Sequence, residues 1–243
     1  MSLSSVSVSG MLHMMGLTMG SGPFGPHPRG QFDFDRPSRI RYVEDFPRRV
    51  RGEKDGVTVI DSERVKLVWV TGNLPQYAFP AEDVKVRAHA VKGLEGYVAL
   101  AWNAVDAWFE EDEQVFVHVR DPYSRIDVVL EPTRHVRVAI EGQTLADGKP
   151  RILYETGLPP RYYFDPSEVR LDLLTPTDKQ TGCAYKGSAR YWSYGDQKDV
   201  AWAYDNPLWD GERIRGRIAF FNERVVLEVD GITQDKPLTE WSG

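Results

Sequence analysis

The 243-residue chain contains a single cysteine, Cys183. One cysteine cannot close an internal disulfide, and one chain of this composition cannot supply a zinc site made of several thiolates. The five histidines are scattered, without the four-residue spacing that would place two ligands on one helix face. We therefore expect no metal and no other cofactor. A lone cysteine is also compatible with a reducing, cytoplasmic location.

Long apolar runs are absent as well, so the sequence predicts no membrane-spanning segment. The 30 basic and 36 acidic residues give a net charge of −6, and they are interspersed along the chain. Binding to nucleic acid needs clustered Lys and Arg, so we do not expect nucleic acid as a partner. The acidic run at residues 110–113 is expected to form a solvated hairpin tip.

Methionine is absent after residue 19, although the first 19 residues hold all five methionines of the chain. A stretch rich in Gly and Pro follows up to residue 30. This composition differs from that of a folded domain, so we interpret residues 1–39 as a leader followed by an extended arm.

The rest of the sequence contains one motif twice. The pattern Pro-x-Tyr-x-Phe-x-x-x-Asp-Val occupies residues 75–84, and the same pattern with Glu in place of Asp occupies residues 160–169. Upstream, Asp55-Gly56 resembles Glu141-Gly142. Further matches lie downstream: Lys92-Gly93 resembles Lys186-Gly187, Ala101-Trp102 resembles Ala201-Trp202, and Trp108 resembles Trp209.

This repetition predicts a tandem duplication of one small module. We expect a diverged first copy at residues 40–131 and a second copy with the fuller motif set at residues 132–243.

Alternation of apolar and polar residues with period two, as at residues 136–140, indicates β-strands, and no long helical stripe is found. The predicted fold class is all-β, with two homologous modules of about seven or eight strands each. Asp165 followed by Pro166 predicts the start of one helical turn. Strands are predicted at 171–174, 188–194 and 199–204, with a break at 175–178.

Candidate catalytic chemistry centres on Cys183 and Lys186. An ammonium group close to a thiol lowers the thiol pKa, and the resulting thiolate is a nucleophile or a redox group. The chain has no histidine after residue 135, so the usual base for such a thiol is missing from the second copy. The competing interpretation is a buried thiol that only packs under the loop.

Candidate ligand-binding chemistry comes from the aromatic residues of the second copy. Lys186 would supply charge, tyrosine hydroxyls would donate hydrogen bonds and rings would stack on the ligand. The competing interpretation assigns most of these rings to the core. The residues proposed to bind a ligand are Tyr162, Tyr163, Lys186, Gly187, Arg190, Trp192, Trp202 and Tyr204.

The runs at residues 156–164, 183–192 and 201–207 resemble the family labelled domain of unknown function 427, closely over residues 136–231 and more weakly over residues 50–129. The resemblance implies a mostly β fold that occurs in tandem, similar to that of the β-tent group. Many β-tent proteins hold zinc through four cysteines, which this chain lacks. The family is also filed as nucleotidyltransferase-like. However, the sequence has no Gly-Ser element followed by paired carboxylates, which metal-dependent nucleotidyl transfer requires.

The leading hypothesis is therefore a metal-independent β protein that binds a small molecule in an aromatic pocket of the second copy. One alternative is an enzyme that uses Cys183 activated by Lys186. Another is a protein-interaction module. The sequence does not predict the ligand or the oligomeric state.

Overall fold

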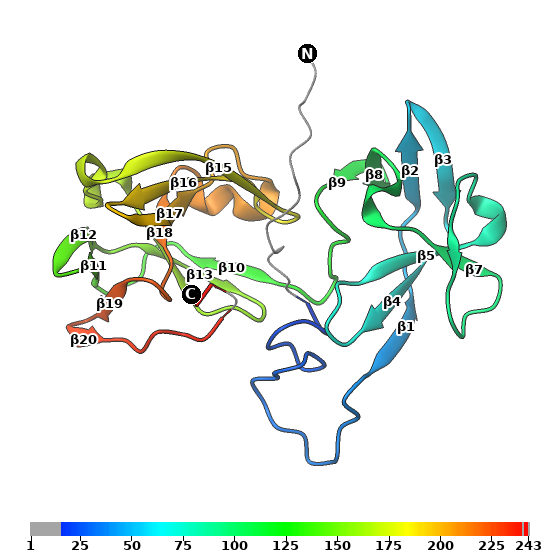
Figure 1. Cartoon of the computed structure of the whole chain (residues 1–243), viewed down its shortest axis with the longest axis horizontal. Helices are drawn as coiled ribbons and strands as arrows, with labels where there is room; N and C mark the ends of the chain where they lie inside the picture. The colour runs from blue at the N-terminus through cyan, green and yellow to red at the C-terminus, as the bar shows by residue number, and fades with distance from the viewer. Residues whose placement is uncertain (1–15, 240, 243) are drawn as a thin grey trace.

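The structure, a computed structural model, describes residues 16–239 and 241–242, so the expected leader at residues 1–15 lies outside the described part. The predicted all-β fold is confirmed: the described residues form twenty short strands and five short 3-10 helices. Strands gather in two groups that lie side by side (Figure 1). Within the described chain, no helix has the length and apolar character needed to cross a membrane.

The first group, here called the N-terminal sheet pair, spans residues 41–115. Its five-stranded sheet has the order β1-β4-β5-β7-β6, and its four-stranded sheet has the order β3-β2-β8-β9. Its elements are β1 (Arg41–Asp45), β2 (Val50–Lys54), β3 (Val57–Ser62), β4 (Lys66–Val70), β5 (Gln76–Pro80), η1 (Ala81–Asp83), β6 (His89–Ala90), β7 (Tyr97–Ala99), η2 (Trp102–Ala104), β8 (Ala107–Glu110) and β9 (Glu113–Val115).

The second group, the C-terminal sheet pair, spans residues 126–233. Its seven-stranded sheet has the order β10-β13-β14-β18-β17-β16-β15, and its four-stranded sheet has the order β12-β11-β19-β20. Its elements are β10 (Ile126–Val129), β11 (Val136–Ile140), β12 (Gln143–Gly148), β13 (Arg151–Glu155), β14 (Arg161–Phe164), η3 (Pro166–Glu168), η4 (Leu171–Leu173), β15 (Thr175–Cys183), β16 (Gly187–Tyr194), β17 (Gln197–Ala203), η5 (Trp209–Ile214), β18 (Ile218–Phe220), β19 (Val226–Val229) and β20 (Ile232–Thr233).

The strand registers of the two sheet pairs correspond. Lys66 lies opposite Ala78 in the first pair, and Arg151 lies opposite Tyr163 in the second, at the offset of the repeated motif. The first β-hairpin of each four-stranded sheet carries one register shift, between Gly52 and Glu53 in β2 and between Val138 and Ala139 in β11. The largest difference is the hairpin β15–β16, which extends the second sheet and has no counterpart in the first.

The three downstream sequence matches fall at different places in the fold. Trp108 lies within β8, whereas Trp209 begins η5. Lys92 lies in the turn between β6 and β7, whereas Lys186 lies in the turn between β15 and β16. Trp102 begins the turn η2, whereas Trp202 lies within β17. Their similarity therefore does not reflect equivalent positions in the two sheet pairs.

Local predictions have mixed outcomes. The helical turn after Asp165 is confirmed as a capping box, in which Asp165 accepts from the backbone of Ser167 and Glu168 reaches back to the cap. The hairpin tip is confirmed between β8 and β9, where residues 111–113 are exposed, but Glu110 is buried and binds Tyr77 and Arg48, so it is not solvated as predicted. The strand predicted at 171–174 is wrong, because those residues form the turn η4. The break predicted at 175–178 is also wrong, since β15 begins at residue 175.

Each sheet pair encloses its own apolar core. Alternating side chains of β11, such as Val136, Val138 and Ile140, are buried because one face of the strand packs on the opposing sheet. In the N-terminal sheet pair the core contains Leu67, Trp69 and the other inward-facing side chains of β4 and β5. The C-terminal sheet pair buries a second cluster on the outer face of its seven-stranded sheet.

The segment that precedes β1 joins the two sheet pairs. From residue 16 onward it folds into successive turns. Thr18 donates to the carbonyl of Asn73, and Ser21 donates to the carbonyl of Gly157. The linker between the pairs is fixed by Tyr185, whose hydroxyl accepts from the backbone of Asp121 at 2.6 Å. The arm and the linker thus hold both pairs in contact.

We expect Tyr185→Phe to lower the free energy of unfolding by about 1–3 kcal/mol, because it leaves the buried N–H of Asp121 without an acceptor. Urea denaturation measures the change. Tyr123→Phe is the matched control: its hydroxyl donates to Glu44 on an exposed surface, so its loss has a small effect. Equal destabilisation by both variants would contradict the assigned role of Tyr185.

Candidate functional site

The predicted aromatic site of the second half is divided between the two faces of the seven-stranded sheet. Trp192 lies opposite Ala201 and Tyr191 lies opposite Trp202, so Trp192 and Trp202 point to opposite faces. Trp192 belongs to the core between the sheets, and Tyr162 packs against that core. Trp202 belongs to the cluster on the outer face. These residues therefore do not line one pocket.

Arg190 and Gly187 have structural roles in the hairpin β15–β16. Arg190 forms an exposed ion pair with Asp205 at 2.6 Å, and its guanidinium lies 4.2 Å from the ring centre of Trp192. Gly187 adopts a φ of 89°, and a Cβ there would lie 3.3 Å from the backbone nitrogen of Leu208. Glycine is required at this close approach.

The structure does bring Tyr163, Cys183, Lys186, Trp202 and Tyr204 to the same outer face. Tyr163 accepts a hydrogen bond from the indole of Trp202 at 3.1 Å. All five side chains are buried. These five predicted residues thus form one cluster, but their side chains are packed in the interior.

Two buried ion pairs accompany these residues, and three of their four members were missed by the sequence analysis. Lys186 pairs with Glu155, and Arg161 binds Glu223 through two hydrogen bonds of 2.8 and 2.7 Å. We call Glu155, Arg161, Lys186 and Glu223 the buried charge cluster. The available signal was Glu155 at the end of the apolar run Ile152-Leu153-Tyr154, where a charge needs a partner.

Burial raises the pKa of the Cys183 thiol, which is the opposite of the predicted direction. Lys186 does act to lower this pKa, but desolvation outweighs it and Glu155 counters its charge. The predicted activation of Cys183 by Lys186 is therefore corrected: the thiol is buried, and the ammonium is already neutralised by a carboxylate.

The pKa values of Lys186 and Glu223 are both shifted in the direction that favours the charged form. Burial disfavours the charged form of Lys186, but the electrostatic influence of Cys183 and Glu155 outweighs burial and raises its pKa. Burial likewise disfavours ionised Glu223, but hydrogen bonds from Arg161 and Thr239 hold its pKa below the usual value. Paired charges of this kind fix a packing arrangement and need no ligand.

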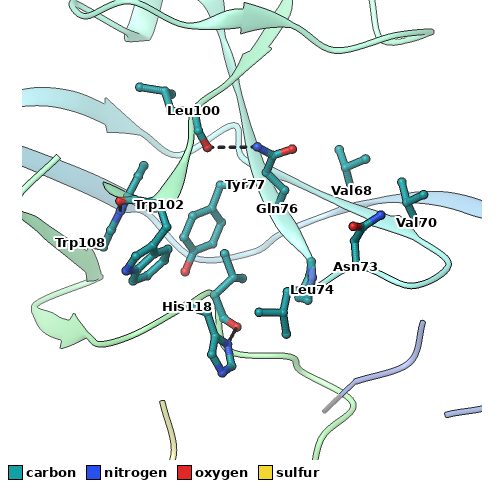
Figure 2. Close-up of a pocket in the computed structure, with 12 residues that line it drawn as sticks. Val68, Val70, Asn73, Leu74, Gln76, Tyr77, Leu100, Trp102, Trp108 and His118 are labelled. Atoms are coloured by element: carbon teal, nitrogen blue, oxygen red, sulfur yellow. Dashed lines mark hydrogen bonds between the residues drawn. The ribbon is translucent and has the colours of Figure 1, made fainter. Parts of the chain in front are cut away.

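An open hollow lies instead in the N-terminal sheet pair. The main hollows of the described part of the chain are lined by residues outside the buried charge cluster. The one shown in Figure 2 has a volume of about 460 Å³ and lies where the turn between β4 and β5 faces the linker at residues 118–119. We call it the aromatic pocket, after its ring-bearing residues Tyr77, Trp102, Trp108 and His118.

The rings of the aromatic pocket are fixed before any ligand binds. Trp102 and Trp108 stack with ring centres 5.5 Å apart, and the Trp108 indole donates to the Trp102 carbonyl at 2.8 Å. The hydroxyl of Tyr77 donates to Glu110, and burial raises the pKa of Tyr77 well above its usual value. Gln76 donates from its side-chain amide to the Leu100 carbonyl at 3.0 Å, as Figure 2 shows.

His118 gives the pocket a defined polar group. Burial lowers the pKa of His118, so its imidazole is neutral at neutral pH. Its Nδ1 lies 2.7 Å from the Val119 carbonyl, which can only accept, so Nδ1 carries the proton and Nε2 is an acceptor. The same ring meets the edge of Tyr185 at 6.1 Å, which places the pocket beside the contact between the sheet pairs.

The sequence analysis missed this pocket because it searched the copy with more aromatic residues. The available signal was Tyr77 in the repeated motif together with Trp102 and Trp108. These tryptophans were compared with Trp202 and Trp209, which lie elsewhere in the fold, and Trp209 is 89% exposed.

The comparisons with known proteins agree with the fold of the second half. Residues 128–232 match the model of a domain of unknown function, DUF427. This supports the predicted resemblance over most of the C-terminal sheet pair, while the aromatic pocket lies outside the matched residues. A search of curated proteins finds no match. Across the residues that the structure describes, no group of three or more His, Cys, Asp or Glu is arranged to hold a metal.

Removing one partner of the Lys186–Glu155 pair leaves an uncompensated buried charge. We expect Lys186→Met to lower the free energy of unfolding by about 3–5 kcal/mol. The double variant Lys186→Met with Glu155→Leu should recover much of this loss, because neither charge then remains. A double-mutant cycle by urea denaturation measures the coupling. Additive losses would show that the two side chains do not act as a pair.

Alkylation of Cys183 by iodoacetamide should be slow in the folded protein across neutral and mildly alkaline pH, because the thiol is buried and its pKa is raised. The same protein in urea is the control, where labelling should follow the usual thiol pKa of about 8.5. Rapid labelling of the folded protein near neutral pH would restore the catalytic interpretation.

Proposed function

We propose that this protein binds a small, planar, ring-containing molecule in the aromatic pocket of the N-terminal sheet pair. The observation that carries this proposal is the preformed hollow between Trp102, Tyr77 and His118 (Figure 2). Its volume of about 460 Å³ lies within the range of small-molecule sites. Rings held by their own hydrogen bonds lose little freedom when a ligand binds, which favours affinity.

The side chains of the pocket suit recognition of an aromatic ligand. The stacked Trp102 and Trp108 offer a flat apolar surface, and aromatic faces attract other rings in offset or edge arrangements. The Nε2 acceptor of His118 would select a ligand with a hydrogen-bond donor. The exposed side chain of Asn73, on the turn that borders the hollow, supplies both a donor and an acceptor.

We also infer that the two sheet pairs arose by duplication, with the second copy beginning at β10, before the predicted boundary between residues 131 and 132, because β10 pairs with β13 as β1 pairs with β4. The matching strand order, register shift and motif offset support this inference. In this proposal the first copy binds the ligand and the second copy stabilises the assembly. The buried free thiol of Cys183 supports a reducing, cytoplasmic location.

Naphthalene-1-acetamide, a neutral planar compound, tests the proposed site. In protein labelled with ¹⁵N-tryptophan, we expect saturable shifts of the Trp102 and Trp108 indole signals. Those of Trp192 and Trp202 should not move, because both rings lie in the C-terminal sheet pair and do not line the hollow. A shift confined to the exposed Trp209 would indicate surface adhesion only and would contradict the proposal.

A matched pair of variants locates the binding. Asn73→Trp adds a ring at the border of the hollow without removing a core side chain, so it should weaken binding of the amide about tenfold or more. Asn103→Trp adds the same ring at an exposed position that does not line the hollow, and it should leave binding unchanged. Equal affinities of both variants would place the site elsewhere.

A further inference from the structure

A second hollow adjoins the aromatic pocket on the outer face of the five-stranded sheet. It has a volume of about 530 Å³, and its lining includes four basic side chains. We call it the basic groove, after Arg39, Arg41, His89 and Lys92. No carboxylate lines it.

The strand register explains why these side chains converge. Arg41 lies opposite Val70 in β1 and β4, so both point to the same face of the sheet. His89 lies opposite Ala99 at the far edge of that sheet. The turn that carries Lys92 approaches the first strand, since a Cβ placed on Gly93 would lie 3.6 Å from Nη1 of Arg41. Arg41 at one edge of the sheet and Lys92 beside the other edge thus flank the same outer face.

The charges of the basic groove are not neutralised by the protein. Among the residues that the structure describes, Arg39, Arg41, His89 and Lys92 form no ion pair. Neighbouring arginines of the same sheet pair do form such pairs; Arg49, for example, binds Asp61 at 2.6 Å. A group of unpaired cations is notable in a chain with a net charge of −6. It creates a local positive potential that attracts an anion.

The basic groove and the aromatic pocket are neighbours, because Val68, Val70 and Gln76 line both hollows. One ligand can therefore occupy the ring-lined part with an aromatic group and reach the cations with a charged group. The apolar floor formed by Val68 and Val70 would contact the portion between them.

In the C-terminal sheet pair, the corresponding outer face of the seven-stranded sheet is buried. Glu155 and Arg161 occupy the places of Val70 and Gln76 in the corresponding register. There, each charge is paired internally and the face is buried. The N-terminal sheet pair lacks the additional hairpin, and its cations remain unpaired at an open face.

We propose that the ligand of the aromatic pocket carries an anionic group, a carboxylate or a phosphate, that binds to Arg41 and Lys92 in the basic groove. This inference rests on the proposed function, because it assumes that the aromatic pocket holds the ring. The ligand class is an aromatic or heteroaromatic anion. Arginine binds either oxyanion through two parallel hydrogen bonds, and lysine adds a point charge.

The test compares three probes that share one ring system: naphthalene-1-acetate, 1-naphthyl phosphate and the neutral naphthalene-1-acetamide. We expect at least one anion to bind about tenfold more tightly than the amide, with the same Trp102 and Trp108 shifts. The preferred anion tells carboxylate from phosphate. Equal affinities of all three probes would overturn the inference while leaving the proposed function intact.

Variants identify the groups responsible. Arg41→Gln combined with Lys92→Gln should abolish the preference for the anion and leave binding of the amide unchanged. Lys54→Gln, which removes an exposed lysine of the other sheet, is the matched control and should retain the preference. An anion preference that survives the double variant would overturn the assignment to Arg41 and Lys92. Failure of every probe to shift Trp102 and Trp108 would instead overturn the proposed function.

Discussion

Neighbouring side chains of a β-strand point to opposite faces of its sheet, and in this protein that constraint decides which residues can act together. Trp192 and Trp202 lie on adjacent strands, yet a difference of one position in the register sends them to different cores. The same rule places Arg41 and Val70 on one outer face with Gln76, although they come from three strands. A site on this scaffold must therefore be assembled from one face or at the end of a sheet, where both faces meet.

The two sheet pairs use their outer faces differently. In the C-terminal pair, the hairpin β15–β16 and the turn η5 accompany a buried face that contains the Lys186–Glu155 and Arg161–Glu223 pairs. Buried charges are tolerated only when they are paired, so this face depends on both partners of each pair. In the N-terminal pair, the corresponding face keeps small and apolar side chains on its floor and leaves its cations at the edges. Burial thus agrees with the supporting role that we propose for one pair, and the open face agrees with the binding role that we propose for the other.

The sequence predicted the class of fold because period-two alternation and the repeated motif are local properties that survive without tertiary information. The capping box after Asp165 was predictable for the same reason, since its partners lie within four residues. The strand expected at 171–174 was not, because an apolar run such as Leu171-Asp172-Leu173-Leu174 suits a turn packed on the core equally well. The aromatic pocket was only partly predictable, although Tyr77, Trp102 and Trp108 provided a signal. It depends on His118 in a linker meeting Tyr77 and Trp102, and no pattern along the chain records that meeting. The larger number of aromatic residues favoured the second copy as the place of the ligand site, but most rings of that copy belong to its core.

Glu155, the partner of Lys186, shows most clearly why the sequence alone suggested a reactive Cys183. A lysine near a cysteine predicts an activated thiol only if the ammonium is free to act on it. Glu155 comes from a distant strand and neutralises that ammonium, so the same two residues that suggested catalysis become part of a packed interior. In the N-terminal pair the position equivalent to Glu155 is Val70, and no acid faces Arg41 or Lys92 in the groove. The absence of one carboxylate from the open face is therefore what leaves positive charge available to a ligand. Function on this fold follows from which charges remain unpaired more than from which reactive side chains are present.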